Sequence, residues 1–248
     1  MPNPSIFPAI PNLNARDRFA NLISNATKYV MDQDCAVEVR KPYISPDYAG
    51  KYREGDSSRI EAITDRINNC IDAFCESDAS HLWLIDADIE IPRHALRTLL
   101  NLNADVSSGI YCFHNDPAIM MFGRGAEGNP RMFKPRGLDG WRGVTLGENE
   151  RVGGGNGCML IRRRVFDIYN PAIKSLRFVH AEQGGSDLHF WYRCQEAGFK
   201  CRITGEVLCG HNPQSPLSFY EGEEFRKQQA LFREFKEETA KRHDPPPS

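Results

Sequence analysis

The chain has 248 residues, of which 40% are hydrophobic and 26% charged, with a formal net charge of −2. This composition is that of a globular protein with one α/β domain, or one domain and a small appendage. The low net charge excludes a strong general attraction to nucleic acid or to an anionic membrane. No apolar run reaches the ~20 residues that a membrane-spanning helix needs.

The start of the chain shows no basic-then-apolar signal pattern. Its eight cysteines are scattered, without a C-x-x-C pair. This spacing argues against a zinc site or a disulfide framework and favours a reducing, cytoplasmic location.

Hydrophobic periodicity predicts strands that alternate with helices. In the first half we expect strands over 5–10, 35–39 and 82–85, helices over 14–31 and 57–74, a helix with Pro92 in its first turn, and a polar loop over 43–56. In the second half we expect strands over 105–113, 118–122, 141–146, 157–161, 200–204 and 206–209, helices over 163–169, 186–197 and 219–242, an irregular stretch over 123–140 and a glycine-rich loop over 151–156. This alternation indicates a single α/β domain.

The sequence around Asp86 and Asp88 carries the strongest chemical signal. Leu82 to Ile85 form an apolar run of strand length, and the two aspartates follow it directly. Side chains two apart in a strand point to the same side. We therefore expect both carboxylates to lie together at the carboxyl end of this strand, where open α/β sheets bind ligands. Such an oxygen pair suits Mg²⁺ or Mn²⁺. The alternative is a polar turn with two solvated aspartates.

Several segments in order resemble the GT-A fold glycosyltransferases, especially the family 2-like nucleotide-sugar enzymes. They are Leu82-Trp83-Leu84-Ile85-Asp86-Ala87-Asp88, the run from Gly153 to Arg163, Gly185-Ser186-Asp187-Leu188-His189-Phe190 and Gly198-Phe199-Lys200. The resemblance covers about residues 55 to 215. It implies a GT-A domain over 1–215 with a mixed, mostly parallel sheet flanked by helices. A charged helix and a disordered Pro-rich tail would follow over 216–248.

The resemblance also implies roles for the acidic residues and a late histidine. Asp88 would bind the metal ion directly, and Asp86 would hold the ribose or a metal-bound water. Asp187 would act as the base that deprotonates the acceptor hydroxyl. Its alternative is the N-cap of the helix that begins there. His211 would be a third metal ligand, although a lone histidine is often an ordinary surface or core residue.

Two further segments are expected near the donor. By resemblance the glycines of 153–157, with Gly154 and Gly155 at their centre, lie near the donor sugar and the acceptor. A flexible hairpin is the alternative. Arg66 and Asn69, on the helix before the D-x-D strand, are expected to contact the nucleotide, and a solvated helix face is the alternative.

The sequence thus predicts a glycosyltransferase that depends on Mn²⁺ or Mg²⁺, with a nucleoside-diphosphate sugar as donor. The acceptor would be a hydroxyl of a glycan, lipid, protein or modified nucleobase, and Asp187 as base would favour inversion. A haloacid dehalogenase-type phosphohydrolase also places D-x-D after an apolar strand, but usually near the start of the chain. A GT-A domain that binds a nucleotide sugar or glycan without turnover is the non-enzymatic alternative.

Overall fold

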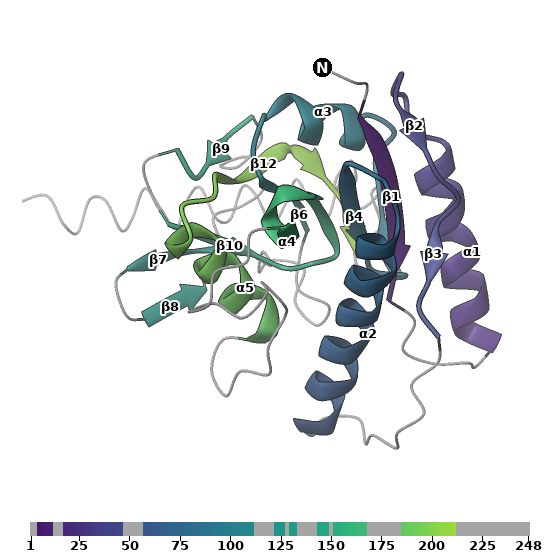
Figure 1. Ribbon diagram of the computed structural model, residues 1–248, viewed down its shortest axis with the longest axis horizontal. Helices are drawn as coiled ribbons and strands as arrows, with labels where there is room; N and C mark the ends of the chain where they lie inside the picture. Colours follow the sequence, from purple (N-terminus) through teal and green to yellow (C-terminus); the bar gives the residue numbers. More distant parts are fainter. Residues whose placement is uncertain are drawn as a thin grey trace, which may run out of the picture.

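The computed structural model describes residues 4–11, 17–46, 57–111, 122–126, 129–132, 143–148, 151–167 and 185–211. Figure 1 shows a central sheet with helices packed against it. The eight-stranded sheet of the described residues has the order β2-β1-β4-β11-β6-β12-β9, and β3 also pairs with β1. The strand bounds are β1 Ser5–Ile10, β2 Glu38–Val39, β3 Tyr43–Ile44, β4 His81–Ile85, β6 Val106–Ile110, β9 Thr145–Leu146, β11 Cys158–Arg162 and β12 Cys201–Leu208.

The sheet is mixed and mostly parallel. Strand β1 pairs in parallel with β2, β3 and β4, and β6 pairs in parallel with β12. Strand β11 lies between these two groups and is antiparallel to both β4 and β6. The edge strand β9 is antiparallel to β12. The parallel strands on both sides of β11 therefore end at the same edge of the sheet.

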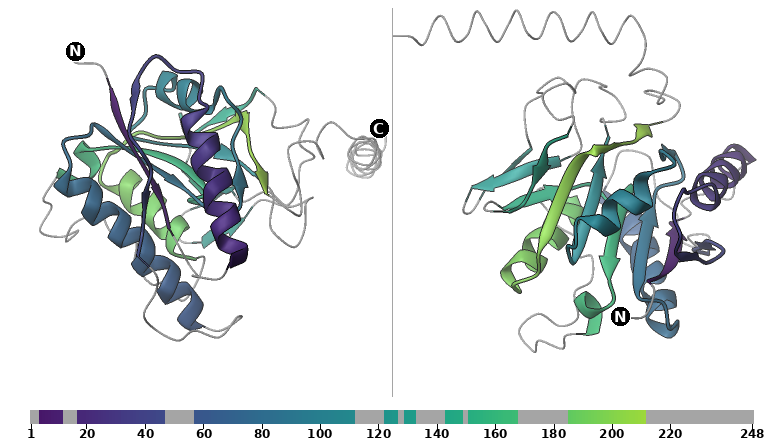
Figure 2. Two further views of the ribbon diagram at one scale, coloured as in Figure 1. Left: turned by 90° about the vertical axis from the view of Figure 1, so that its right-hand side faces the viewer. Right: turned by 90° about the horizontal axis from the view of Figure 1, so that it is seen from above.

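The helices cover both faces of the sheet. They are α1 Asp17–Met31, α2 Ser57–Glu76, α3 Ala95–Asn101, α4 Arg164–Asp167 and α5 Gly185–Glu196. Leu82 and Leu84 of β4 face a core with α2 and α5, whereas Trp83 and Ile85 face a core with α1 and α3. This alternation follows from the period of two along a strand. Figure 2 shows α1 and α2 on opposite sides of the sheet.

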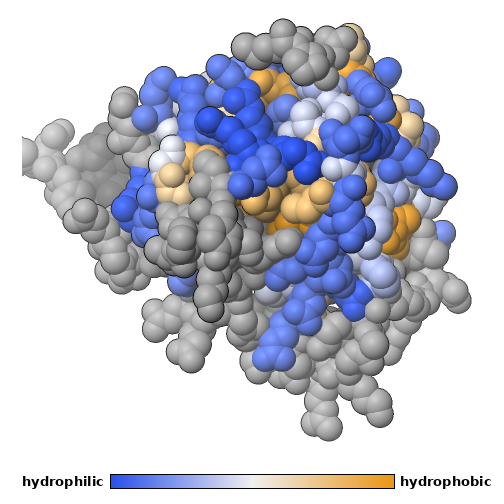
Figure 3. All heavy atoms as spheres, viewed as in Figure 1, coloured by the Kyte–Doolittle hydropathy of each residue, from blue (hydrophilic) through white to orange (hydrophobic). Residues whose placement is uncertain are grey.

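Two smaller sheets complete the described fold. One has the order β10-β7-β8, with bounds Val152–Gly154, Phe122–Ala126 and Asn129–Met132. The other is the antiparallel pair of β5 (Ile89–Glu90) and β13 (Gly210–His211). The described residues on the face shown in Figure 3 are mostly hydrophilic, with small apolar areas between the polar side chains.

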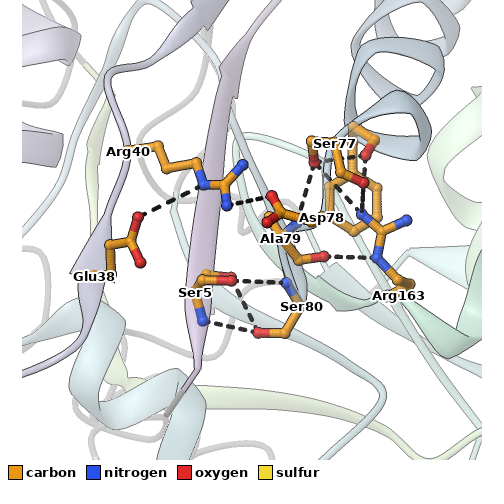
Figure 4. Close-up of polar contacts among 9 residues, drawn as sticks. Ser5, Glu38, Arg40, Ser77, Asp78, Ala79, Ser80 and Arg163 are labelled. Carbon is orange, nitrogen blue, oxygen red and sulfur yellow. Dashed lines mark hydrogen bonds and ion pairs between the residues drawn. The ribbon is translucent and has the colours of Figure 1, made fainter. Parts of the chain in front are cut away.

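Arg163 secures the turn between α2 and β4. Its guanidinium donates hydrogen bonds to the carbonyl oxygens of Phe74, Ser77 and Ala79, at 3.0, 2.8 and 2.6 Å. These are carbonyls at and beyond the end of α2, which lack partners within the helix. Figure 4 shows the same turn bound to β1 through Ser80 and Ser5. One side chain after β11 thus supports the strand that leads to the aspartates.

Most of the predicted elements that lie within the described residues are present, with some corrections to their bounds. The strand predicted over 35–39 is confined to 38–39, and the one over 105–113 ends at 110. The predicted strands 200–204 and 206–209 form one strand, β12, with an irregular register. Pro92 precedes α3 and is not in its first turn.

Three segments predicted to be irregular contain strands instead. Tyr43–Ile44, in the predicted loop, extends the sheet beside β1. The stretch 123–140 contains an antiparallel hairpin formed by β7 and β8. The glycine-rich segment 151–156 contains β10, so Gly153 and Gly154 lie in a strand and not in a loop. The predicted helix 219–242, the tail and most of the predicted strand 118–122 lie outside the described residues.

No helix within the described ranges is long and apolar enough to cross a membrane.

Candidate functional site

Asp86 lies at the end of β4 and begins a tight turn. The amide of Ile89 donates to the carbonyl of Asp86 at 3.1 Å, and the amide of Asp86 donates to the carbonyl of Gly157 at 3.2 Å. Asp86 and Asp88 are therefore held in a turn after β4 and not on an extended strand, which the prediction that their side chains point to the same side had assumed. Both side chains remain partly exposed at the carboxyl end of β4.

Asp88 lies beside His211. The Nε2 atom of His211 is 3.3 Å from Oδ2 of Asp88. The short pairing of β5 with β13 places His211 opposite Ile89, the residue after Asp88. The side chain of His211 is 10% exposed and that of Asp88 35%. In this pair the imidazole is thus largely buried, whereas the carboxylate is accessible to solvent.

Tyr111 lies beside His211 and follows β6 directly, as Asp86 follows β4. Its hydroxyl oxygen accepts a hydrogen bond of 2.9 Å from the amide of Gly157. Its ring meets the His211 ring edge-on, with centroids 5.7 Å apart. A side chain at Gly157 would place its Cβ 2.9 Å from both the Tyr111 hydroxyl and Ile89. Glycine is therefore required where β11 approaches the turn.

Asp187 lies in the first turn of α5, which begins at Gly185, so it is not the residue that precedes the helix as an N-cap. Burial raises the pKa of Asp187 to about 6, opposed by a hydrogen bond from its own backbone amide. Its charge also contributes to the raised pKa values of Asp86 and Tyr111. These interactions bring Asp187 into the same electrostatic cluster as Asp86.

Burial raises the pKa of Asp86 to about 7, although part of its side chain is exposed. The negative charges of Asp88 and Asp187 act in the same direction, and His211 opposes them. The pKa of Tyr111 is well above its ordinary value, because the hydroxyl is buried and lies among these carboxylates. Three acidic side chains close together are unfavourable unless protons or a cation compensate their charge.

Carboxylate and imidazole groups suit Mn²⁺, and carboxylates with water suit Mg²⁺. Asp86, Asp88 and His211 therefore fit a divalent cation by the chemistry of their donor atoms. Within the ranges that the structure describes, no three His, Cys, Asp or Glu side chains are grouped closely enough to hold a metal ion. Asp88 and His211 are the two expected ligands in direct contact.

The glycine-rich segment packs closely against α5. A Cβ at Gly153 would lie 2.7 Å from Leu188, the residue after Asp187. Gln195 of α5 also binds both the amide and the carbonyl of Val152, at 2.9 and 2.7 Å. The glycines thus let β10 and α5 approach each other. Gly154 and Gly155 are buried at this position, and their contact with a donor stays a prediction.

Arg66 and Asn69 have different surroundings on α2. Arg66 is 3% exposed, whereas Asn69 is exposed. The charge of Arg66 and that of Asp86 both act on the thiol of Cys70, with opposite effects on its pKa. The solvated-face interpretation therefore agrees with Asn69 but not with Arg66. Arg66 lies on the side of α2 that faces the sheet.

No family model matches the chain, and no curated protein matches it. Among solved structures, the chain is similar to that described as the crystal structure of A197 from STIV, with a TM-score of 0.47 and 16% sequence identity. The similarity covers 84% of this chain and 85% of that one. A likeness at this score and identity says nothing about activity.

Proposed function

We propose that the protein is a metal-dependent glycosyltransferase of the GT-A type. It would transfer a sugar from a nucleoside-diphosphate sugar to a hydroxyl of a glycan, lipid, protein or modified nucleobase. The observation that supports this proposal is the cluster of Asp86, Asp88, Asp187 and His211 at the carboxyl end of β4. Ligands of open α/β sheets bind at this edge.

Asp88 and His211 would hold the cation, and Asp86 would bind the ribose or a water molecule of the cation. Bound Mn²⁺ or Mg²⁺ supplies positive charge that stabilises the leaving diphosphate. Arg66, buried on α2, would add positive charge beside the donor. The cation would thereby compensate the negative charge of both the acidic cluster and the donor diphosphate.

Asp187 would serve as the base. A carboxyl group with a pKa of about 6 is mostly ionised above pH 7, and it is more basic than a solvated aspartate. As the acceptor oxygen bonds to the anomeric carbon, the bond from that carbon to the diphosphate oxygen breaks. The hydroxyl proton passes to Asp187. Attack from the side opposite the leaving group inverts the anomeric centre.

A thermal-shift screen of nucleotide sugars with and without Mn²⁺ tests the proposal. A ligand that binds only the folded state raises the melting temperature by mass action. We expect one nucleoside-diphosphate family to stabilise the protein, and to do so strongly only with Mn²⁺. Stabilisation by no nucleotide at millimolar concentration would contradict the donor assignment.

Donor hydrolysis then separates turnover from binding. We expect Asp88→Ala and Asp187→Asn to lose at least about 100-fold in hydrolysis, whereas only Asp88→Ala loses the Mn²⁺-dependent stabilisation. Asp167→Asn is the matched control, because Asp167 is exposed on α4, beyond the other end of β11. Stabilisation by a donor without hydrolysis or transfer would indicate a binding domain, and phosphatase activity on simple phosphoesters would indicate the dehalogenase-type alternative.

A further inference from the structure

A cavity of about 530 Å³ opens at the end of the sheet opposite to the acidic cluster. Its walls come from the amino end of β1, the segment between α1 and β2, the carboxyl end of α3 and the strands β4 and β11. The volume lies within the range of small-molecule sites in proteins. His81 is the first residue of β4, so about 16 Å of strand separates this pocket from Asp86. The pocket is therefore distinct from the acidic site.

The pocket has apolar and cationic walls. Val37 and Leu100 provide apolar surface, and Arg97 and Arg162 provide two guanidinium groups. Arg97 forms an ion pair of 3.0 Å with Asp34, which also lines the pocket. The acidic and basic side chains around the cavity therefore leave one positive charge, that of Arg162.

Arg162 has no carboxylate partner among the described residues. Its guanidinium donates to the neutral amide oxygen of Asn103 at 2.6 Å. The nearby carboxylate of Asp105 accepts hydrogen bonds from the Arg164 guanidinium at 2.5 and 2.6 Å. It also accepts a hydrogen bond from the backbone amide of Lys200 at 2.9 Å. Asp105 is thus bound directly by Arg164 and Lys200, and Arg162 acts on it only through its charge. The Arg162 guanidinium therefore remains able to bind an anion.

His81 lies beside Arg162, because these two residues are direct partners in the pairing of β4 with β11. Its Nδ1 is 2.8 Å from the Ser80 hydroxyl. Burial, and then the charge of Arg162, lower the pKa of His81 to about 4. His81 is thus neutral at pH 7, and an anion beside Arg162 would favour its protonated form.

We propose that this pocket binds a small organic molecule with one anionic group, a carboxylate or a phosphate, next to an apolar part. The anion would lie between Arg162 and Arg97, and the apolar part would lie against Val37 and Leu100. Both cations come from elements that meet only in the folded domain, so the site does not exist in the unfolded chain. No part of this inference depends on glycosyl transfer.

Proton NMR of the His81 ring tests the proposal, with butyl phosphate and butyrate as probes. A His81→Gln variant assigns the signal. We expect a saturable shift with at least one probe, together with a rise of one unit or more in the pKa of His81. 1-Butanol lacks the anionic group, and inorganic phosphate lacks the hydrocarbon group. Both should therefore bind at least ten-fold more weakly than the better of the two probes.

Variants then locate the binding. Arg162→Gln should weaken the probe at least ten-fold, and Arg162→Lys should retain part of the affinity. Arg93→Gln, at an exposed arginine before α3 that does not line the cavity, should leave it unchanged. Asp88→Ala should also bind normally, which separates this inference from the proposed function. No saturable shift with either anion, or equal binding by Arg162→Gln, would overturn the proposal.

Discussion

His211 and Asp88 are 123 residues apart in the chain, and their side chains meet at 3.3 Å. The short β5–β13 pairing, which lies outside the main sheet, creates this contact. Removing the imidazole should therefore weaken the cation site more than the fold. We expect His211→Ala to lower Mn²⁺ affinity about 10- to 100-fold in calorimetric titrations.

The matched control for this variant is His94→Ala. His94 is exposed, and within the described ranges its ring hydrogen-bonds only to the Glu206 carbonyl. Its removal should leave Mn²⁺ affinity unchanged. Equal affinities of His211→Ala and the unaltered protein would exclude His211 from the cation site.

The raised pKa of Asp86 predicts how stability depends on pH when a chelator removes divalent cations. The pKa is about 7 in the folded protein against an ordinary 3.8. Between these values the folded state binds more protons than the unfolded state, so the free energy of unfolding falls as pH rises from about 4 to about 7. An Asp86→Asn variant cannot ionise and should lose this contribution.

Urea unfolding at pH 5 and pH 8 in EDTA measures the difference. We expect the decrease in stability to be about 2 kcal/mol smaller in Asp86→Asn. This is below the roughly 4 kcal/mol of a three-unit shift, because the side chain is partly solvated. Asp167→Asn should show the same decrease in stability between pH 5 and pH 8 as the unaltered protein. If Asp86→Asn also shows that full decrease, Asp86 ionises in the folded protein at little cost in free energy.

Tyr111→Phe should destabilise the protein by about 1–3 kcal/mol in urea unfolding, because the buried amide of Gly157 loses its acceptor. We also expect a lower activity, since the Gly157 carbonyl holds Asp86 in place. Tyr29→Phe is the control, at a half-buried tyrosine of α1 whose hydroxyl has no hydrogen-bond partner among the described residues. Stabilities of the two variants within about 0.5 kcal/mol of each other would count against the Tyr111 contact.

Arg163→Ala should be strongly destabilising without a specific effect on cation binding. It removes the guanidinium donor of the Ser77 and Ala79 carbonyl oxygens, and one donor of the Phe74 carbonyl, which still accepts from the amide and hydroxyl of Ser77 (Figure 4). We expect a loss of about 2–4 kcal/mol. Arg151→Ala removes only an exposed ion pair of 3.7 Å with Glu196 and should change stability by less than about 1 kcal/mol. Similar unfolding midpoints for the two variants would contradict this role.

The sequence predicted the elements with the clearest periodicity. Strand β4 and helix α2 combine strong apolar patterns with abrupt ends, and both lie where we expected them. The β7–β8 hairpin was missed because Gly123, Gly125 and Pro130 disfavour strands. The glycines of β10 were read as a loop for the same reason. Their place in a strand is set by the close packing of α5, a tertiary effect that no local pattern expresses.

The site was predictable where acidic residues directly follow an apolar strand in the sequence. Asp86 and Asp88 followed from their position after an apolar strand, but the turn that holds them depends on Gly157, 71 residues later. Tyr111 was missed, although it follows β6 as Asp86 follows β4. A search for polar residues just after every predicted parallel strand would have found it. Its pairing with Gly157 and His211 depends on long-range contacts.

The position of β11 has a consequence for the order in which the chain can fold during synthesis. Strand β11 is made after both β4 and β6, yet it lies between them and hydrogen-bonds to both. A nascent chain that ends before Cys158 therefore leaves one edge of β4 and both edges of β6 unpaired, because β12 is also still missing. Unpaired strand edges are prone to association. We expect fragments cut in this region to aggregate, whereas fragments that include β11 can begin to close the sheet.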